Sequence, residues 1–295
     1  MYTFILLLVA LVWGSTFFII KETVSDVNEY FIVFGRTLIA AVVMTIVSLI
    51  RDKKSFLNRD AIIKGSILGL LLALTYIPQT IGLKYTSSGH SAFITGAAVA
   101  LVPLLLFLFY RESINKMDIL SVVIVVFGLY LLTYNADTKI NIGDLITLIT
   151  MIAYALNIVL AGRYVKNSDV FTMVTFQFIT ASIISGLIYV FSDTPALELS
   201  SKSIWAILYL GFIGTLFCYF VTIWVQQFVS TLRLAIILSL EPIFASWLAY
   251  AIVNEILTQK EIIGAFVILA GVTTYQLSET YKSNKLKLKS KTFSE

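Results

Sequence analysis

Long apolar runs, separated by short polar connections, cover almost the whole chain. A helix needs about 20 mostly apolar residues to cross a hydrocarbon core about 30 Å thick. Runs of this length predict ten membrane-spanning helices, at residues 2–20, 30–50, 61–83, 89–109, 117–134, 143–162, 171–191, 204–226, 232–253 and 260–277. Because several connections are only a few residues long, neighbouring helices are expected to be antiparallel. The pattern therefore predicts an all-α integral membrane protein.

Composition supports lipid as the solvent for most of the chain. Hydrophobic residues make up 59% and charged residues 13% of the 295 residues, and the mean hydropathy is +0.93. Soluble domains carry about 25% charged residues, so a water-soluble fold is excluded. The first apolar run lacks a basic leader and is interpreted as a retained helix. The single cysteine, Cys218, excludes an intrachain disulfide.

The distribution of Lys and Arg predicts the orientation in the membrane. The net charge is +4, but the basic residues lie in short loops between apolar runs, which argues against a nucleic-acid partner. With the N-terminus inside, fifteen Lys and Arg face the cytoplasm and five face outward. This bias predicts a multi-pass protein of the cytoplasmic membrane with both termini cytoplasmic. The Lys-rich tail, 280–295, is interpreted as a solvated end, and attraction to anionic lipid is the alternative.

The sequence contains a weak internal repeat. An ungapped offset of 143 residues relates Tyr85–Tyr134 to the second half, and an offset of 141 places Arg36 on Gln177. The matched positions include Ser87 with Ser230, Ala92 with Ala235, Glu112 with Glu255, Asp118 with Glu261 and Gly128 with Gly271. Each unit, 1–135 and 140–279, contains five helices, so the second must enter the membrane with inverted topology. Inverted repeats recur in secondary transporters that work by alternating access.

Short motifs extend this interpretation. They are Trp13-Gly14-Ser15-Thr16-Phe17, Gly82-Leu83-Lys84-Tyr85-Thr86-Ser87, Ser91-Ala92-Phe93-Ile94-Thr95-Gly96, Pro103 with Arg111-Glu112, Ser239-Leu240-Glu241-Pro242, and Asn254-Glu255 followed by Gly264 and Gly271. In order and spacing, the chain resembles the EamA-type proteins of the drug/metabolite transporter superfamily. The resemblance implies a ten-helix carrier, often an exporter of amino acids or other metabolites. It also implies that helices one to four and six to nine line a central cavity, with helices five and ten outside.

Two ionisable residues lie deep within predicted spans, Arg36 and Glu241. Each costs at least ~2.5 kcal/mol at a helix centre and is expected to face a cavity or a partner. At about 1.5 Å per residue, their depths differ by roughly 6–7 Å, so a pair across the halves is feasible. A static pair that locks helices two and nine is the favoured interpretation. In the alternative, Glu241 couples protons or binds a cation and Arg36 contacts an anion; the unlike repeat mates, Gln177 and Ala98, support it.

Prolines and glycines within the spans predict local geometry. Pro78, Pro103 and Pro242 predict kinks that expose backbone carbonyls, with ordinary packing curvature as the alternative. Pro103 and Pro242 stand at different distances before their following glutamates, so they are not symmetry mates. Gly65 and Gly69 form a GxxxG pattern suited to close helix contact. A monomer and a homodimer both fit the sequence.

Polar and aromatic residues within the spans are candidates to line a solute cavity. They are Trp13, Ser15, Arg36, Tyr76, Gln79, Thr95, Tyr154, Asn157, Gln177, Trp224 and Gln226. Amides and ring faces suit a zwitterionic or amphipathic organic solute. For each residue alone, interfacial anchoring or bonding between helices is the competing interpretation. Trp13 and Asn157 are the strongest candidates, and His90, the only histidine, lies at the outer mouth of helix four.

Other functional classes find little support. The sequence has no HExxH, GxSxG or Walker A motif and no His or Cys cluster, so neither an enzyme, a metal site nor a cofactor is expected. The charges are too few for the lining of an ion channel. The sequence therefore predicts a secondary transporter that exports small organic metabolites, with protons as the candidate coupling ion. The alternative is a flippase for an amphiphilic or lipid-linked intermediate.

Overall fold

The computed structural model describes residues 1–133, 141–192, 199–253 and 258–292, and these residues form helices without a β-strand. The first half contains α1 (Tyr2–Thr23), α2 (Glu29–Arg51), α3 (Lys53–Phe56), α4 (Arg59–Tyr85), α5 (Ser88–Gly96), α6 (Ala98–Tyr110) and α7 (Lys116–Thr133). The second half contains α8 (Ile142–Tyr164), α9 (Val170–Phe191), α10 (Ser201–Tyr209), the π-helix η1 (Leu210–Phe217), α11 (Cys218–Val225), α12 (Thr231–Leu238), α13 (Glu241–Val253) and α14 (Gln259–Thr292).

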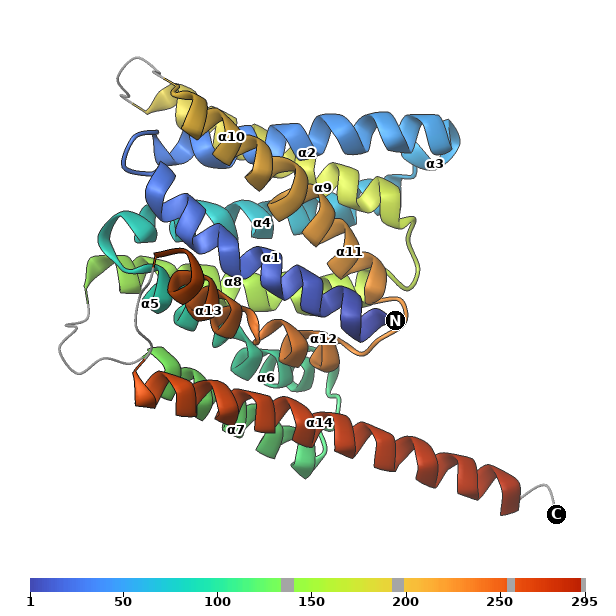
Figure 1. The fold of residues 1–295 in the computed structure, drawn as a ribbon. Coiled ribbons are helices and arrows are strands. Elements are labelled where there is room, and N and C mark those ends of the chain that lie inside the picture. The colour runs from blue at the N-terminus through green and yellow to red at the C-terminus, as the bar shows by residue number, and fades with distance from the viewer. Residues whose placement is uncertain (134–140, 193–198, 254–257, 293–295) are drawn as a thin grey trace.

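These elements build the predicted ten-helix bundle. Nine segments of the described chain are long and apolar enough to cross a membrane; α5 with α6, α10 with η1 and α11, and α12 with α13 each count as one. The tenth, α7, lies beside α14 at the edge of the bundle (Figure 1). The helix ends agree with the sequence prediction to within a few residues, except that α14 continues to Thr292. The first residue of α1 and the last residue of α14 lie at the same end of the bundle (Figure 1), called here the termini end.

Local sequence explains where the helices begin. Asn28 accepts hydrogen bonds from the backbone of Tyr30 and Phe31 at the start of α2. Asn141 and Asp144 form a capping box at the start of α8. Such side-chain caps satisfy backbone N–H groups that have no partner within the helix. The polar residues of the short connections therefore fix the ends of the apolar spans.

Two spans are interrupted at matching positions of the repeat. The fourth breaks at Ala97, between α5 and α6, and the ninth breaks at Ser239 and Leu240, between α12 and α13. At the offset of 143, Ala97 corresponds to Leu240. Pro242 is the second residue of α13. Proline is tolerated in the first turn of a helix, where its missing backbone N–H would have no partner within the helix, so the span is interrupted just before Pro242. The two breaks pack together, because a Cβ on Gly96 would lie 3.2 Å from Pro242 Cγ.

Glycines bring several helix pairs into close contact. The Cβ positions of Gly65 and Gly69 on α4 are occupied by the backbone of Met173 and Gln177 on α9. The GxxxG pattern thus joins two helices of one chain rather than offering a free face for dimerisation. Gly128 likewise places α7 against α14, since a Cβ there would lie 2.6 Å from the backbone nitrogen of Ile268.

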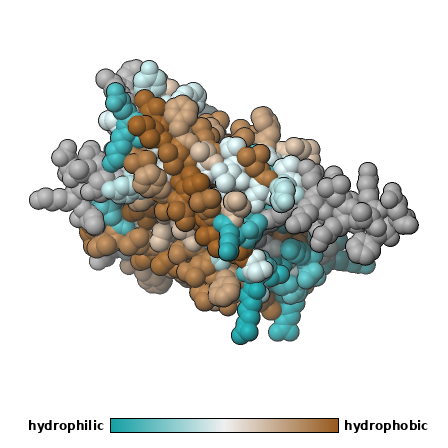
Figure 2. All heavy atoms as spheres, turned by 90° about the horizontal axis from the view of Figure 1, so that it is seen from below, coloured by the Kyte–Doolittle hydropathy of each residue, from teal (hydrophilic) through white to brown (hydrophobic). Residues whose placement is uncertain are grey.

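The outer surface matches a lipid environment. Seen from the side of α7 and α14, a broad hydrophobic band crosses the molecule and hydrophilic residues gather toward its margins (Figure 2). Large apolar side chains on these helices are exposed, among them Val123, Phe127 and Phe266. The helices α7 and α14, which are spans five and ten, therefore lie at the edge of the bundle, where the resemblance implies that they stand.

Candidate functional site

A small cavity lies at the centre of the bundle. Its volume is about 20 Å³, and a buried site needs roughly 10–15 Å³ of such volume to hold one water molecule. It is lined by Trp13, Thr16, Arg36, Thr75, Tyr76, Gln79, Thr95, Tyr154, Tyr219 and Glu241. These residues come from α1, α2, α4, α5, α8, α11 and α13. Both halves thus surround a space with room for about one water.

Four aromatic rings form the wall of the cavity. Trp13 and Tyr154 meet edge to face at 5.9 Å and 81°, and Tyr76 and Tyr219 do so at 5.6 Å and 88°. Trp13 also contacts Tyr219 at 5.1 Å. The first pair is separated by the repeat offset of 141 and the second by the offset of 143. The aromatic wall is therefore built from two pairs of repeat mates, each meeting across the interface of the halves.

Arg36 is the buried cation of this site, with 1% of its surface exposed. Its Nε donates a hydrogen bond to Thr215 Oγ1 at 2.8 Å, and its guanidinium carbon lies 3.8 Å from the centre of the Tyr76 ring. Its Nη1 is buried and has no hydrogen-bond partner. An unsatisfied buried donor costs about 1–3 kcal/mol, and more when it is charged. Arg36 therefore has one buried hydrogen-bond donor, Nη1, without an acceptor.

Glu241 is the buried carboxylate of the site and the first residue of α13. The positive end of the helix dipole favours a negative charge at this position, which helps explain how a carboxylate is tolerated at 5% exposure. Arg36 and Glu241 line the same cavity, yet the ion pairs of the described residues do not join them. The structure therefore places both charges at one site without the direct pair that the sequence made feasible.

The other sequence candidates divide into two groups. Gln79 and Thr95 line the cavity and lie within hydrogen-bond distance of each other, 3.4 Å. Five candidates lie elsewhere. The Ser15 hydroxyl is hydrogen-bonded to Val12 and Tyr209. The side-chain amides of Asn157 and Gln226 donate hydrogen bonds to the backbone carbonyls of Leu68 and Ile158. Trp224 packs on Tyr2 and Phe228, and Gln177 is fully buried between helices. These contacts connect helices and do not reach the cavity.

Sequence reasoning missed three lining residues, Thr16, Thr75 and Tyr219. A signal for Tyr219 was present, because it stands at the repeat offset of 143 from Tyr76. Thr16 is one helical turn beyond Trp13, and its hydroxyl bonds to the Trp13 carbonyl. Threonine is common in membrane-spanning helices, so the sequence does not mark Thr75 as a residue that lines a cavity.

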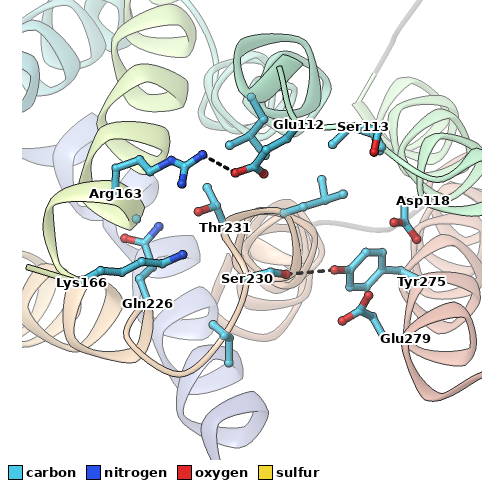
Figure 3. Close-up of a pocket in the computed structure, with 15 residues that line it drawn as sticks. Glu112, Ser113, Asp118, Arg163, Lys166, Gln226, Ser230, Thr231, Tyr275 and Glu279 are labelled. Carbon is cyan, nitrogen blue, oxygen red and sulfur yellow. Dashed lines mark hydrogen bonds and ion pairs between the residues drawn. The ribbon is translucent and has the colours of Figure 1, made fainter. Parts of the chain in front are cut away.

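A second, polar pocket of about 210 Å³ opens at the termini end (Figure 3). Arg163 forms an ion pair with Glu112 on one side of it, and Ser230 and Tyr275 are hydrogen-bonded at 3.1 Å on another. The pocket shares no lining residue with the central cavity. It is therefore a vestibule at one end of the bundle, separate from Arg36 and Glu241.

Two contacts join the halves at opposite ends of the bundle. Away from the termini, His90 Nδ1 lies 3.4 Å from Asp144 Oδ1, which also accepts a hydrogen bond from Thr86. At the termini end, Arg233 Nη2 donates to Thr3 Oγ1 at 3.0 Å. His90 and Arg233 are related by the offset of 143, and Thr3 and Asp144 by the offset of 141. We call these repeat-related contacts the two latches.

Metal ligation has no support in the described part of the chain, where His, Cys, Asp and Glu form no group of three or more suited to a metal ion. The cavity instead offers one guanidinium, one carboxylate, aromatic faces and hydroxyl groups. These groups suit reversible binding of a small polar solute.

Comparison with known proteins finds similarity to transporters over nearly the whole chain. The model of the EamA-like transporter family matches residues 1–134 and again 141–275. An uncharacterized transporter of Archaeoglobus fulgidus is 30% identical over 272 residues, covering 92% of this chain and 84% of the relative. The uncharacterized transporter YoaV of Bacillus subtilis is 22% identical, covering 90% and 92%.

A solved crystal structure of a protein has the same fold. It superposes with a TM-score of 0.77 at 14% sequence identity and covers 92% of this chain and 95% of its own. Together with the two family matches, which account for nearly the whole chain, these similarities show that the protein belongs to the EamA-like transporter family and is a multi-pass membrane transporter.

Proposed function

We propose that the protein is a secondary transporter of small zwitterionic solutes, amino acids or related compounds, and that it exports them by alternating access. One observation carries the proposal: Arg36 and Glu241 line the same buried, aromatic-lined cavity, and no ion pair among the described residues joins them. Two opposite charges held apart in a desolvated site are costly, since each loses its hydration. A solute that carries both charges would compensate both residues at once.

The groups of the cavity suggest the orientation of such a solute. Its carboxylate would accept a hydrogen bond from the unpartnered Nη1 of Arg36. Its ammonium group would lie near Glu241 and against the ring faces of Tyr154 and Tyr219, where cations are attracted by the ring quadrupole. With a volume of about 20 Å³, the cavity is too small for this cargo. Binding therefore requires the halves to separate at one end.

The latches support alternating access around this cavity. The Lys and Arg distribution supports a termini end that faces the cytoplasm. In that orientation Arg233–Thr3 would lie at the inner side and His90–Asp144 at the outer side. Opening toward one side breaks one latch and can leave the other closed. Because the latches are repeat mates in inverted halves, the two openings are related movements, as in other inverted-repeat carriers.

Glu241 also supports the direction of transport. The ammonium group of the cargo and a proton would compete for the same carboxylate, because either one neutralises it. Mutually exclusive binding at one alternating site couples the two fluxes in opposite directions. A proton gradient directed into the cell would then drive cargo out, so protons are the proposed coupling ion.

A lipid-linked amphiphile is the second candidate cargo. An apolar groove of about 810 Å³ runs between α6 and α7 on the outer surface, and it shares Ser113 and Ile114 with the polar pocket at the termini end. A polar pocket beside an apolar groove would suit a molecule with a polar head and a hydrocarbon tail. The buried opposite charges at the centre favour the zwitterion instead.

Counterflow in proteoliposomes tests the proposal. Vesicles are loaded with a mixed pool of amino acids and other polar metabolites, and exchange is measured by mass spectrometry with and without a pH gradient. Exchange confined to zwitterionic solutes, and accelerated by the gradient, is the expected result. If the pool does not exchange while a head-group-labelled lipid moves between leaflets of the same vesicles, the amphiphile is the cargo and the zwitterion proposal is wrong.

A further inference from the structure

A two-residue segment of the second half holds side chains from three helices of the first. The carbonyl of Gly214 accepts hydrogen bonds from Trp13 Nε1 at 2.8 Å and from Tyr76 Oη at 3.4 Å. The next residue, Thr215, accepts one from Arg36 Nε at 2.8 Å. Trp13, Arg36 and Tyr76 belong to α1, α2 and α4 and all line the central cavity. The segment therefore fixes three cavity residues from across the interface of the halves.

The backbone of this segment is unusual. Gly214 and Thr215 lie in η1, a π-helical stretch within an otherwise α-helical span. Such stretches account for well under 1% of residues and occur often at functional sites, where they replace the regular hydrogen-bond ladder. The equivalent span of the first half, α4, is α-helical from Arg59 to Tyr85. This span is thus π-helical in the second half and α-helical in the first, a difference between the halves like that at Arg36 and Glu241.

Small residues let the first half approach this segment. A Cβ on Gly214 would lie 3.0 Å from Thr16 Cγ2 and 3.4 Å from Arg36 Nη2. A Cβ on Gly211 would lie 2.8 Å from Ile39 Cδ1. Larger side chains at either position would push α1 or α2 away. The close approach brings the Thr215 hydroxyl within reach of the buried guanidinium.

This arrangement leaves one edge of Arg36 available. A guanidinium binds a carboxylate either side-on, through Nε and one Nη, or end-on, through both Nη groups. Thr215 occupies Nε, the Tyr76 ring covers one face, and Nη1 remains without a partner at 1% exposure of the residue. Nη1, at the end of the guanidinium, is therefore the donor that is left for a ligand.

We propose that Thr215 is a positioning residue that determines specificity: it holds Arg36 so that the end of its guanidinium receives the carboxylate of the solute. The inference rests on the proposed function and extends it. It explains how the site distinguishes a carboxylate from the neutral amide of the same compound. Only the carboxylate compensates the charge that Thr215 holds in place.

The test compares three substitutions at this residue. Thr215→Val keeps the shape and removes the acceptor, Thr215→Ser keeps the hydroxyl, and Thr215→Ala serves if the valine variant does not fold. Counterflow is measured with a pool of L-amino acids and with the same pool amidated at the carboxyl group. We expect Thr215→Val to lower the initial rate for the acids about tenfold or more, as for loss of a hydrogen bond to a charged group.

The rate for the amides should stay low and nearly unchanged, and Thr215→Ser should restore the preference for acids. A structural defect would lower both rates together and would not be selective. If the wild-type protein exchanges amino acids, and neither Thr215→Val nor Thr215→Ala changes the rate or the preference for acids, the positioning role is wrong and the proposed function stands. Exchange of other solutes but no amino acid overturns the proposed function, and with it the assignment of the carboxylate.

Discussion

Trp13 and Tyr76 of the first half meet Tyr154 and Tyr219 of the second across the central cavity, and the repeat offsets pair them one to one. The two latches and the two helix interruptions are related in the same way. Matching positions of the halves therefore build the wall of the cavity and both of its ends.

The charged residues follow the opposite rule. The repeat mate of Arg36 is Gln177, fully buried and with both amide atoms unpartnered, and the mate of Glu241 is Ala98. Under the proposed function, alternation between two equivalent openings requires similar shapes in the two halves, whereas recognition of one dipolar solute requires each charge only once. We therefore propose that the shared features serve movement and the unshared ones serve recognition of the solute.

The largest effect is expected when Arg36 is converted to its repeat mate. Arg36→Gln removes the cation and leaves Glu241 as the only acidic or basic side chain among the described residues that line the central cavity. We expect the initial counterflow rate of the amino-acid pool to fall about 100-fold, the scale of a lost hydrogen bond between charged groups. Gln177→Leu is the matched control and should stay within about threefold. Equal losses in the two variants would contradict the assignment of chemistry to the unshared position.

Glu241→Gln should have the next largest effect, on coupling. The amide cannot take up a proton, so acceleration of transport by a pH gradient should disappear, a loss of about tenfold or more if the carboxylate is the coupling group. The measurement is counterflow with and without the gradient, with Ala98→Ser as the control at the repeat mate. Gradient-driven transport that persists in a folded Glu241→Gln variant would make Glu241 structural.

Removal of one aromatic ring should cost less. Tyr219→Leu is expected to raise the KM for cargo about fivefold, because a cation–π contact contributes about 1 kcal/mol. Tyr76→Leu should cost more, since the Tyr76 ring also covers Arg36. If the two substitutions have the same effect, stacking on Arg36 adds nothing and the wall is symmetric in function as well as in position.

The smallest effects belong to the latches. His90→Ala should increase labelling of a cysteine at Gly89, a position with open space around it, and Arg233→Ala should increase labelling of a cysteine at Thr231, in a Cys218→Ala background. A single polar contact that is partly buried, as these are, contributes about 0.5–1 kcal/mol, so each change should be about two- to fivefold. Each substitution should act at its own end, and labelling that rises at both ends in either variant would refute separate latches.

The sequence predicts the membrane-spanning helices well, but it predicts the interruptions within them poorly. Span length and charge placement predict the ends of α1 or α8 because lipid thickness sets them. The break at Ala97 has no such signal, since Gly96 and Ala97 are common within membrane helices. Its partner at Leu240 is marked only by the following Pro242. The breaks are stabilised by their contact with each other, which a local pattern does not contain.

The site was predictable where residues are rare. Arg36 and Glu241 stand out because a charge in lipid is costly. Asn157 and Gln226 were placed in the cavity but bond to helix backbones instead. In lipid both the inner and the outer faces of a helix are apolar, so hydropathy does not fix which way a helix is turned. Rotation about the helix axis decided which of these side chains reach the cavity.

The small volume of the central cavity has an electrical consequence. A chain of water molecules across a membrane conducts protons, and a space of about 20 Å³ holds about one water. With a contact between the halves at each end, the described conformation offers no column of water from side to side through this cavity. A bundle this tightly closed at its centre would conduct few protons through this cavity, so the membrane around it would keep its electrical resistance.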